Sequence, residues 1–104
     1  MILGPSGQNI YPEEVETVVN SQPYVVDSLV IEDDGGLTAL IYPDFQQGEK
    51  EGMSQEAMVK YMEGTLSELN TILPNYARLK KIEVMSEDFE RTPKKSIKRY
   101  LYQR

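Results

Sequence analysis

The stretch Tyr24–Tyr42, with the sequence YVVDSLVIEDDGGLTALIY, decides the fold class of this chain. β-Branched and aromatic residues fill its first part, Tyr24–Ile31, and apolar residues return in Leu37–Tyr42. Between these two parts lies Asp-Asp-Gly-Gly (residues 33–36), which is typical of the tight turn that joins two antiparallel strands. The stretch therefore predicts a β-hairpin.

Helical patterns lie on both sides of this hairpin. Residues 11–20 carry a proline at the first helical position and valines that recur on one face, which predicts a helix. Residues 54–73 predict a second, longer helix that is capped by Ser54 and weakened in its middle by Gly64. The polar residues 43–52 between the hairpin and this helix are expected to form a loop.

The last third of the chain predicts shorter elements. Residues 81–85 are expected to form a short strand, residues 86–93 a loop, and residues 96–102 a short basic helix or tail. The order of elements predicts an α+β fold, a small sandwich of about three β-strands that includes the antiparallel hairpin, with helices packed on the sheet. A length of 104 residues suits one domain, spanning residues 1–104.

The composition excludes several classes of site. The chain contains no cysteine and no histidine, so it has no disulfides, no thiolate metal site and no cysteine nucleophile. The absence of histidine argues against a zinc enzyme and against a hydrolase with a histidine base, and no metal site is expected. No apolar run approaches the roughly 20 residues that span a bilayer, and no secretory signal is recognised, so we expect no transmembrane segment and a cytoplasmic location.

Charge is distributed unevenly along the chain. The net charge is -6, yet residues 1–77 carry 13 acidic and two basic side chains, whereas residues 78–104 carry nine basic and four acidic ones. An acidic body repels the phosphate backbone of nucleic acids, so no nucleic-acid partner is expected. A local basic region remains able to meet a single phosphate group.

A glycine-rich turn, Gly4-Pro5-Ser6-Gly7-Gln8-Asn9, precedes the first predicted helix. Glycines permit unusual backbone angles and a close approach of another molecule, and the free N–H groups at a helix start favour anions. A plain loop followed by a helix cap explains the same residues and is the more common case. The spacing is not that of a dinucleotide fingerprint, and no strand of any length is expected before the turn.

A second motif lies near the end of the chain, in residues 90–100, ERTPKKSIKRY. It holds five cations within nine residues, which could carry an ammonium group to a phosphate or carboxylate bound elsewhere. Charge runs are more often simply solvated surface. Neither motif identifies an activity by itself.

Taken together, the two motifs resemble a known family. Residues 7–16, GQNIYPEEVE, resemble the G-x-N-I/V-Y-P-x-E-I/V-E segment of the adenylate-forming superfamily, which contains acyl-CoA synthetases, luciferases and the adenylation domains of peptide synthetases. Residues 73–76, LPNY, resemble the L-P-x-Y of that family, and residues 92–99 resemble its terminal signature P-K-T-x-x-G-K-I-x-R. The chain looks most similar to bacterial long-chain fatty acid CoA ligases.

The resemblance implies that residues 1–104 are the mobile C-terminal domain of an AMP-forming, ATP-dependent fatty acyl-CoA ligase, which forms an acyl-adenylate and then an acyl-CoA thioester. It implies ATP, Mg²⁺ and CoA as the substrates and ion of the full-length enzyme, with none of them bound by this domain alone. Its partners would be a large N-terminal ATP-binding domain of the same polypeptide, a fatty acid and CoA. The isolated domain is expected to be inactive, and the full-length enzyme to be cytoplasmic or peripheral to a membrane.

The resemblance also assigns roles to the glycine turn and to the terminal signature. The turn, with Gly4, Ser6, Gly7, Gln8 and Asn9, would line the tunnel for the pantetheine arm of CoA. A lysine of the terminal signature would meet the carboxylate and phosphate oxygens during adenylation, where a fixed cation stabilises developing charge.

One departure from the family pattern concerns that lysine. Ser96 stands where the catalytic lysine is expected. Either the loop shifts so that Lys95 reaches the site, which we favour, or Lys98 substitutes for it, or the adenylating step is lost or altered. Ser96 also keeps an alternative open, in which the chain is a stand-alone interaction module whose basic tail binds an acidic partner or the phosphates of acyl-CoA.

Overall fold

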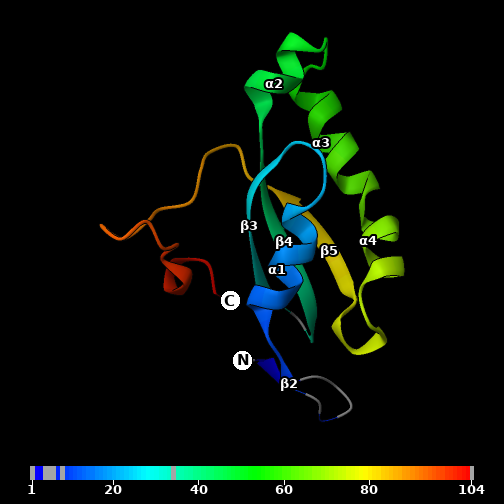
Figure 1. Cartoon of the computed structure of the whole chain (residues 1–104), viewed down its shortest axis with the longest axis vertical. Helices are drawn as coiled ribbons and strands as arrows, with labels where there is room; N and C mark the ends of the chain where they lie inside the picture. The colour runs from blue at the N-terminus through cyan, green and yellow to red at the C-terminus, as the bar shows by residue number, and fades with distance from the viewer. Residues whose placement is uncertain (1, 4–6, 8, 34, 104) are drawn as a thin grey trace.

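The structure, a computed structural model, describes residues 2–3, 7, 9–33 and 35–103. Its centre is a three-stranded sheet of order β3–β4–β5, formed by Val25–Asp33, Gly36–Pro43 and Leu79–Val84. β3 and β4 pair antiparallel as the predicted hairpin, and β5 lies parallel to β4 (Figure 1). The prediction of a small α+β domain with about three strands is confirmed.

Helices cover one face of this sheet (Figure 1). α1 (Pro12–Asn20) lies against β3, while α3 (Gln55–Gly64) and α4 (Leu66–Ile72) lie against β5. Every second residue of the strands points to this side and packs with apolar residues of the helices. The main core on this face includes Val15, Val19, Val30, Ala39, Ile41, Met58, Met62, Leu69 and Ile82.

The C-terminal segment covers part of the opposite face. Leu29, Ile31 and Leu40, which alternate with the residues of the main core, form a second buried cluster with Phe89. Ile97 and Tyr102 pack against this cluster. The expected helix or tail over residues 96–102 is therefore held against the sheet, and only one 3-10 turn, η2 (Arg99–Leu101), is helical.

The prediction of one long helix over residues 54–73 is wrong, because the helix is interrupted between α3 and α4. Thr65 separates the two helices, and its hydroxyl donates to the Met62 carbonyl over 2.6 Å. A threonine that bonds back to the preceding turn disturbs the helical ladder, and Gly64 has low helix propensity.

The loop predicted for residues 43–52 contains a short helix, α2 (Phe45–Lys50). The Asp44 carboxylate caps it by accepting the Gln47 N–H over 3.0 Å. Gly48 lets the helix approach α3 closely, since a Cβ atom there would lie 2.5 Å from the Met58 methyl group. Capping and close packing thus outweigh the polar composition of the segment.

Two further elements differ from expectation. β1 (Ile2–Leu3) and β2 (Asn9–Ile10) pair antiparallel around the glycine turn, so a short strand does precede it. β5 begins at Leu79 rather than residue 81, after the 3-10 turn η1 (Asn75–Ala77). The Asn70 amide explains the early start of β5, since it donates to the Leu79 carbonyl over 2.9 Å and accepts the Leu79 N–H over 2.8 Å.

Candidate functional site

The basic motif forms a small hairpin, which we call the terminal loop (Glu90–Arg99). Three residue pairs face each other across it: Glu90 with Lys98, Arg91 with Ile97, and Thr92 with Ser96. The Lys98 N–H donates to the Glu90 carbonyl over 2.8 Å. The Thr92 N–H donates to the Ser96 carbonyl over the same distance. This pairing determines which side chains share a face of the hairpin.

The tip of the terminal loop contains a left-handed residue. The Lys95 N–H donates to the Thr92 carbonyl over 2.8 Å, and the Lys95 backbone has a φ of 68°. Glycine is usual where a hairpin turn ends in this conformation. The family signature has its glycine directly before its lysine, as Lys95 stands directly before Ser96. The left-handed residue Lys95 thus comes directly before Ser96, which follows the turn.

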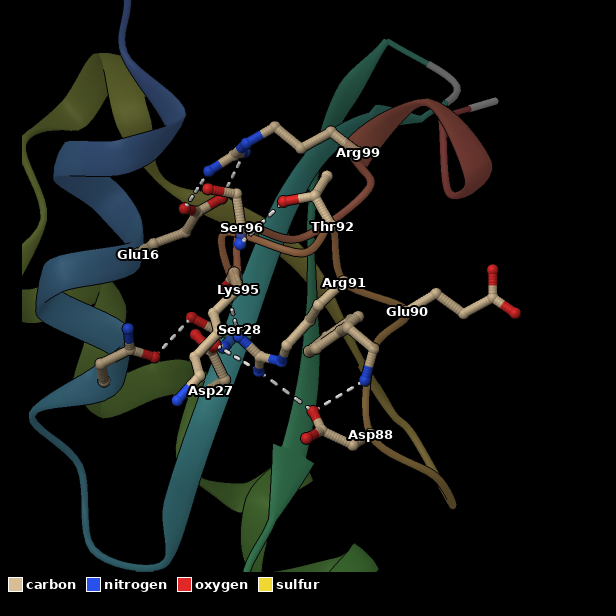
Figure 2. Close-up of polar contacts among 12 residues, drawn as sticks. Glu16, Asp27, Ser28, Asp88, Glu90, Arg91, Thr92, Lys95, Ser96 and Arg99 are labelled. Atoms are coloured by element: carbon tan, nitrogen blue, oxygen red, sulfur yellow. Dashed lines mark hydrogen bonds and ion pairs between the residues drawn. The ribbon is translucent and has the colours of Figure 1, made fainter.

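Side chains of the hairpin alternate between two faces. The inner face, formed by Arg91 and Ile97, points to the sheet, where Ile97 packs on the second core cluster. Figure 2 shows the exposed Lys95 side chain running along the same side as Arg91.

Thr92 and Ser96 flank the inner pair toward the tip of the hairpin and lie on its outer face. Thr92 and Ser96 point away from Arg91 in Figure 2. The Ser96 N–H donates to the Thr92 hydroxyl oxygen over 3.3 Å, which holds these two residues together.

An ion pair anchors the first arm of the terminal loop to β3. Nη2 of Arg91 donates to Oδ2 of Asp27 over 2.7 Å and to Oδ1 of Asp88 over 3.1 Å. Nη1 of Arg91 donates to the Lys95 carbonyl over 3.3 Å. The hydrogen bond to Asp27 is the main cause that raises the pKa of Arg91. Arg91 thus ties strand, turn and loop together.

A second ion pair anchors the other arm to α1. Nη1 and Nη2 of Arg99 donate to Oε2 and Oε1 of Glu16 over 2.8 and 2.6 Å (Figure 2). Oε2 of Glu16 also accepts the Val30 N–H over 2.8 Å. Glu16 is only 7% exposed, and its hydrogen bond raises the pKa of Arg99. A buried carboxylate held by three donors is a rigid attachment point.

Three cations of the terminal loop carry no such pair. Among the residues that the structure describes, no ion pair involves Lys94, Lys95 or Lys98. Lys94 and Lys95 are exposed, and Lys98 is half-buried. The free charge of the loop therefore belongs to these three lysines, while its two arginines hold it in place.

The glycine turn is described only in part. Gly4, Ser6 and Gln8 lie outside the described residues. Gly7 has a φ of 81°, and a Cβ atom there would meet nothing within 4 Å, so its backbone angle rather than a close contact calls for glycine. Asn9 is exposed on β2 and precedes Ile10, which is 3% exposed and fixes the turn to the core.

The structure does not bring the two motifs together. Figure 1 shows β2, which begins with Asn9, beyond one end of the sheet, whereas the terminal segment projects to the side of β3. Within the described ranges, no group of three or more Asp or Glu side chains is placed to hold a metal ion. No helix among these residues is long and apolar enough to cross a membrane.

Comparison with known proteins identifies the family. The sequence model of the AMP-binding enzyme C-terminal domain matches residues 1–104. This chain belongs to that family. A search of curated protein sequences finds no match to this AMP-binding enzyme C-terminal domain.

Solved structures with this fold include acyl-CoA synthetases. A fatty acyl-CoA synthetase from Mycobacterium tuberculosis is 26% identical, with a TM-score of 0.64 over 97% of this chain and 18% of that protein. The o-succinylbenzoate CoA synthetase from Bacillus subtilis, a double mutant with a bound product analogue, is 27% identical, with a TM-score of 0.65 over 95% of this chain and 18% of that protein. An acyl-CoA synthetase from Brucella canis, 18% identical with a TM-score of 0.70 over 99% of this chain and 18% of that protein, shares the fold. The AMP-binding C-terminal domain thus spans 18% of the length of these structures.

Sequence reasoning missed the anchoring role of Glu16 and Arg99 in this AMP-binding C-terminal domain. A usable signal was present, because Glu16 ends the first family segment and Arg99 ends the terminal signature. Two residues of opposite charge that each close a family motif are candidates for a contact. The partners lie 83 residues apart, so local patterns could not reveal it.

Proposed function

We propose that this chain is the mobile C-terminal domain of an ATP-dependent acid–thiol ligase that makes an acyl-CoA thioester. The observation that carries the proposal is the family match over residues 1–104. The structural likeness to two CoA synthetases, at 26% and 27% identity, supports it. A large ATP-binding domain of the same polypeptide would be its partner and would supply the nucleotide and acyl pockets.

The proposed reaction has two steps. The acid carboxylate attacks the α-phosphorus of ATP, so that an acyl-adenylate forms and pyrophosphate leaves. The CoA thiol then attacks the acyl carbonyl, the bond to phosphate breaks, and AMP leaves. Mg²⁺ bound with ATP would neutralise phosphate charge.

The terminal loop would act in the first step. A lysine there, with Lys95 and Lys98 as the candidates, would place a positive charge beside the carboxylate and phosphate oxygens. The free lysines on an otherwise anchored loop support this role, since a fixed cation stabilises charge without reorganising. The glycine turn with Gly7 and Asn9 would act in the second step and line the path of the pantetheine arm.

The proposed acid is a long-chain fatty acid, and the proposed location is the cytoplasm or a membrane periphery. The Thr-Pro and Ile-Lys-Arg residues of the terminal motif support the choice of acid, as does the likeness to a fatty acyl-CoA synthetase. The equal likeness to an o-succinylbenzoate CoA synthetase makes an aromatic acid the natural competitor in the assay.

The test uses the full-length protein encoded by the gene that contains this chain. Pyrophosphate exchange and thioester formation are measured with palmitate, butyrate, benzoate and o-succinylbenzoate. We expect exchange that depends on the acid and is fastest with palmitate, and no activity of residues 1–104 alone. Exchange with none of the acids would contradict the ligase, whereas a preference for benzoate would contradict only the fatty acid.

A second candidate function is a stand-alone interaction module whose basic segment binds an acidic partner or acyl-CoA phosphates. Ser96 in place of the signature lysine is the observation that favours it. The reading frame upstream of the Met1 codon distinguishes the two, because only the ligase requires an ATP-binding half in the same frame.

A further inference from the structure

We infer that Asp27 and Arg91 are positioning residues of the proposed ligase, which hold the tip of the terminal loop in place for adenylation and contribute little to the stability of the fold. The inference rests on the proposed function, in which the terminal loop acts in the first step. Both residues lie outside the three segments that resemble the family, which are residues 7–16, 73–76 and 92–99. The role is therefore assigned by the contacts of this chain.

Arg91 connects the tip of the terminal loop, residues 92–96, to the sheet. Its Nη2 donates to Oδ2 of Asp27 on β3 over 2.7 Å, and its Nη1 donates to the Lys95 carbonyl at the tip over 3.3 Å (Figure 2). In the described part of the chain, the other hydrogen bonds of residues 92–96 stay within the tip. Polar contact between the tip and the sheet thus passes through this one guanidinium group.

The side chain of Arg91 acts through the tip and does not extend outward from it. It lies on the inner face of the hairpin with Ile97, which packs on the second core cluster. Its two terminal nitrogens donate to Asp27, Asp88 and the Lys95 carbonyl. A side chain bound in this way fixes the backbone of the tip, so Arg91 is a positioning residue and not a catalytic one.

The exposure of this ion pair distinguishes it from the pair of Glu16 and Arg99. The side chains of Arg91 and Asp27 are 29% and 25% exposed, whereas that of Glu16 is 9% exposed. Ion pairs that water reaches contribute little to stability, because solvent screens the charges. Loss of the pair should therefore release the tip while the domain stays folded. A misplacement of about 1 Å near reacting groups can lower a rate by roughly 100-fold.

The test measures the two half-reactions of the full-length enzyme separately. Asp27→Ala and Arg91→Ala should each lower the kcat of pyrophosphate exchange by roughly 10- to 100-fold and leave the KM for ATP nearly unchanged. The conversion of supplied acyl-adenylate to thioester should remain unchanged, which also shows that the variants fold. Glu32→Ala, the matched control, removes an exposed carboxylate from the same strand and should retain both half-reactions.

Two further variants test whether Asp27 acts through Arg91. Arg91→Lys keeps the charge, but one ammonium group lacks the planar fork of a guanidinium group, so it should retain more exchange than Arg91→Ala and less than the wild type. Asp27→Ala added to Arg91→Ala should cause no further loss of exchange, since the two residues act as one unit.

Three results would overturn the inference while the ligase stands. They are unchanged exchange in Asp27→Ala, equal losses in both half-reactions, which indicate a purely structural role, and losses that multiply in the double variant. A wild type without any exchange would overturn the proposed ligase and this inference with it.

Discussion

Replacing Arg99 with alanine should destabilise the fold, because Glu16 would lose the partner of its buried carboxylate. The Glu16 side chain is 9% exposed and accepts two bonds from Arg99, of 2.8 and 2.6 Å. Removing one partner of a fully buried ion pair typically costs about 3–5 kcal/mol. The Arg99 side chain is 36% exposed, so water would reach the carboxylate after its removal. We therefore expect a loss of about 2–3 kcal/mol in the free energy of unfolding.

Urea and thermal unfolding of the 104-residue chain measure this loss directly. A change of 2–3 kcal/mol corresponds to a Tm lower by roughly 10–20 °C in a domain of this size. Arg78→Ala is the matched control, since Arg78 is exposed and no ion pair or hydrogen bond of its side chain is found in the described part of the chain. The control should stay within about 0.5 kcal/mol of the wild type.

A double-mutant cycle separates the ion pair from lost packing. Glu16→Gln keeps an oxygen for the Val30 N–H and should cost about 1–2 kcal/mol. The cycle with Arg99→Ala should give a coupling energy of about 1–2 kcal/mol. A coupling below about 0.5 kcal/mol, or an Arg99→Ala variant as stable as the Arg78→Ala control, would refute the reasoning that this pair anchors the terminal loop.

Three smaller changes test other features of the fold. Lys95→Gly should stabilise the chain by about 0.5–1 kcal/mol in thermal unfolding, because it relieves a left-handed backbone; a lower Tm would contradict this. Gly64→Ala should also stabilise by about 0.5–1 kcal/mol, since a Cβ atom there meets nothing within 4 Å, and an unchanged Tm would count against it. Tyr24→Phe removes the 2.6 Å bond to Glu51 that lowers the pKa of this carboxyl group. That bond stabilises the fold above the ordinary pKa of 4.5, and this stabilisation is lost as the pH falls through the lowered pKa. The variant should therefore unfold at a slightly higher pH in acid titrations followed by circular dichroism. Identical acid midpoints for the variant and the wild type would contradict this expectation.

The sequence was informative where structure depends on neighbouring residues. The hairpin of β3 and β4 follows from strand residues around Asp-Asp-Gly-Gly, and α1 follows from its proline and valines. The interruption of the helix at Thr65 depends on the hydroxyl of that residue, which donates to a carbonyl of the preceding turn. The helix α2 depends on Gly48, which packs closely against α3. Composition alone does not distinguish such cases, because a polar segment can be a loop or a capped helix.

The sequence predicted which segment of the chain forms the candidate site, but it did not predict how the side chains of that segment are arranged. The basic residues 91–99 were recognised, but their division into two anchoring arginines and three free lysines was not. Arg91 pairs with Asp27, 64 residues away, and Arg99 with Glu16, 83 residues away. Such contacts form only when the sheet is assembled. From the sequence alone, a run of charged residues is therefore interpreted as solvated surface.

The pairing of Glu16 with Arg99 constrains how the proposed two-step reaction could work. Glu16 lies on α1, the helix that follows the glycine turn, and Arg99 closes the terminal loop. Under the proposed function, the glycine turn and the terminal loop serve different steps. The buried Glu16 carboxylate nevertheless connects the terminal loop to α1 and β3, because it accepts hydrogen bonds from Arg99 and from the Val30 N–H. A loop that moved independently between steps would have to break this attachment at a substantial cost. Under the proposed function, the change from the first to the second step is therefore expected to occur by rotation of the whole domain. Such a rotation keeps the ion pairs intact and brings first the terminal loop and then the glycine turn to the reacting groups.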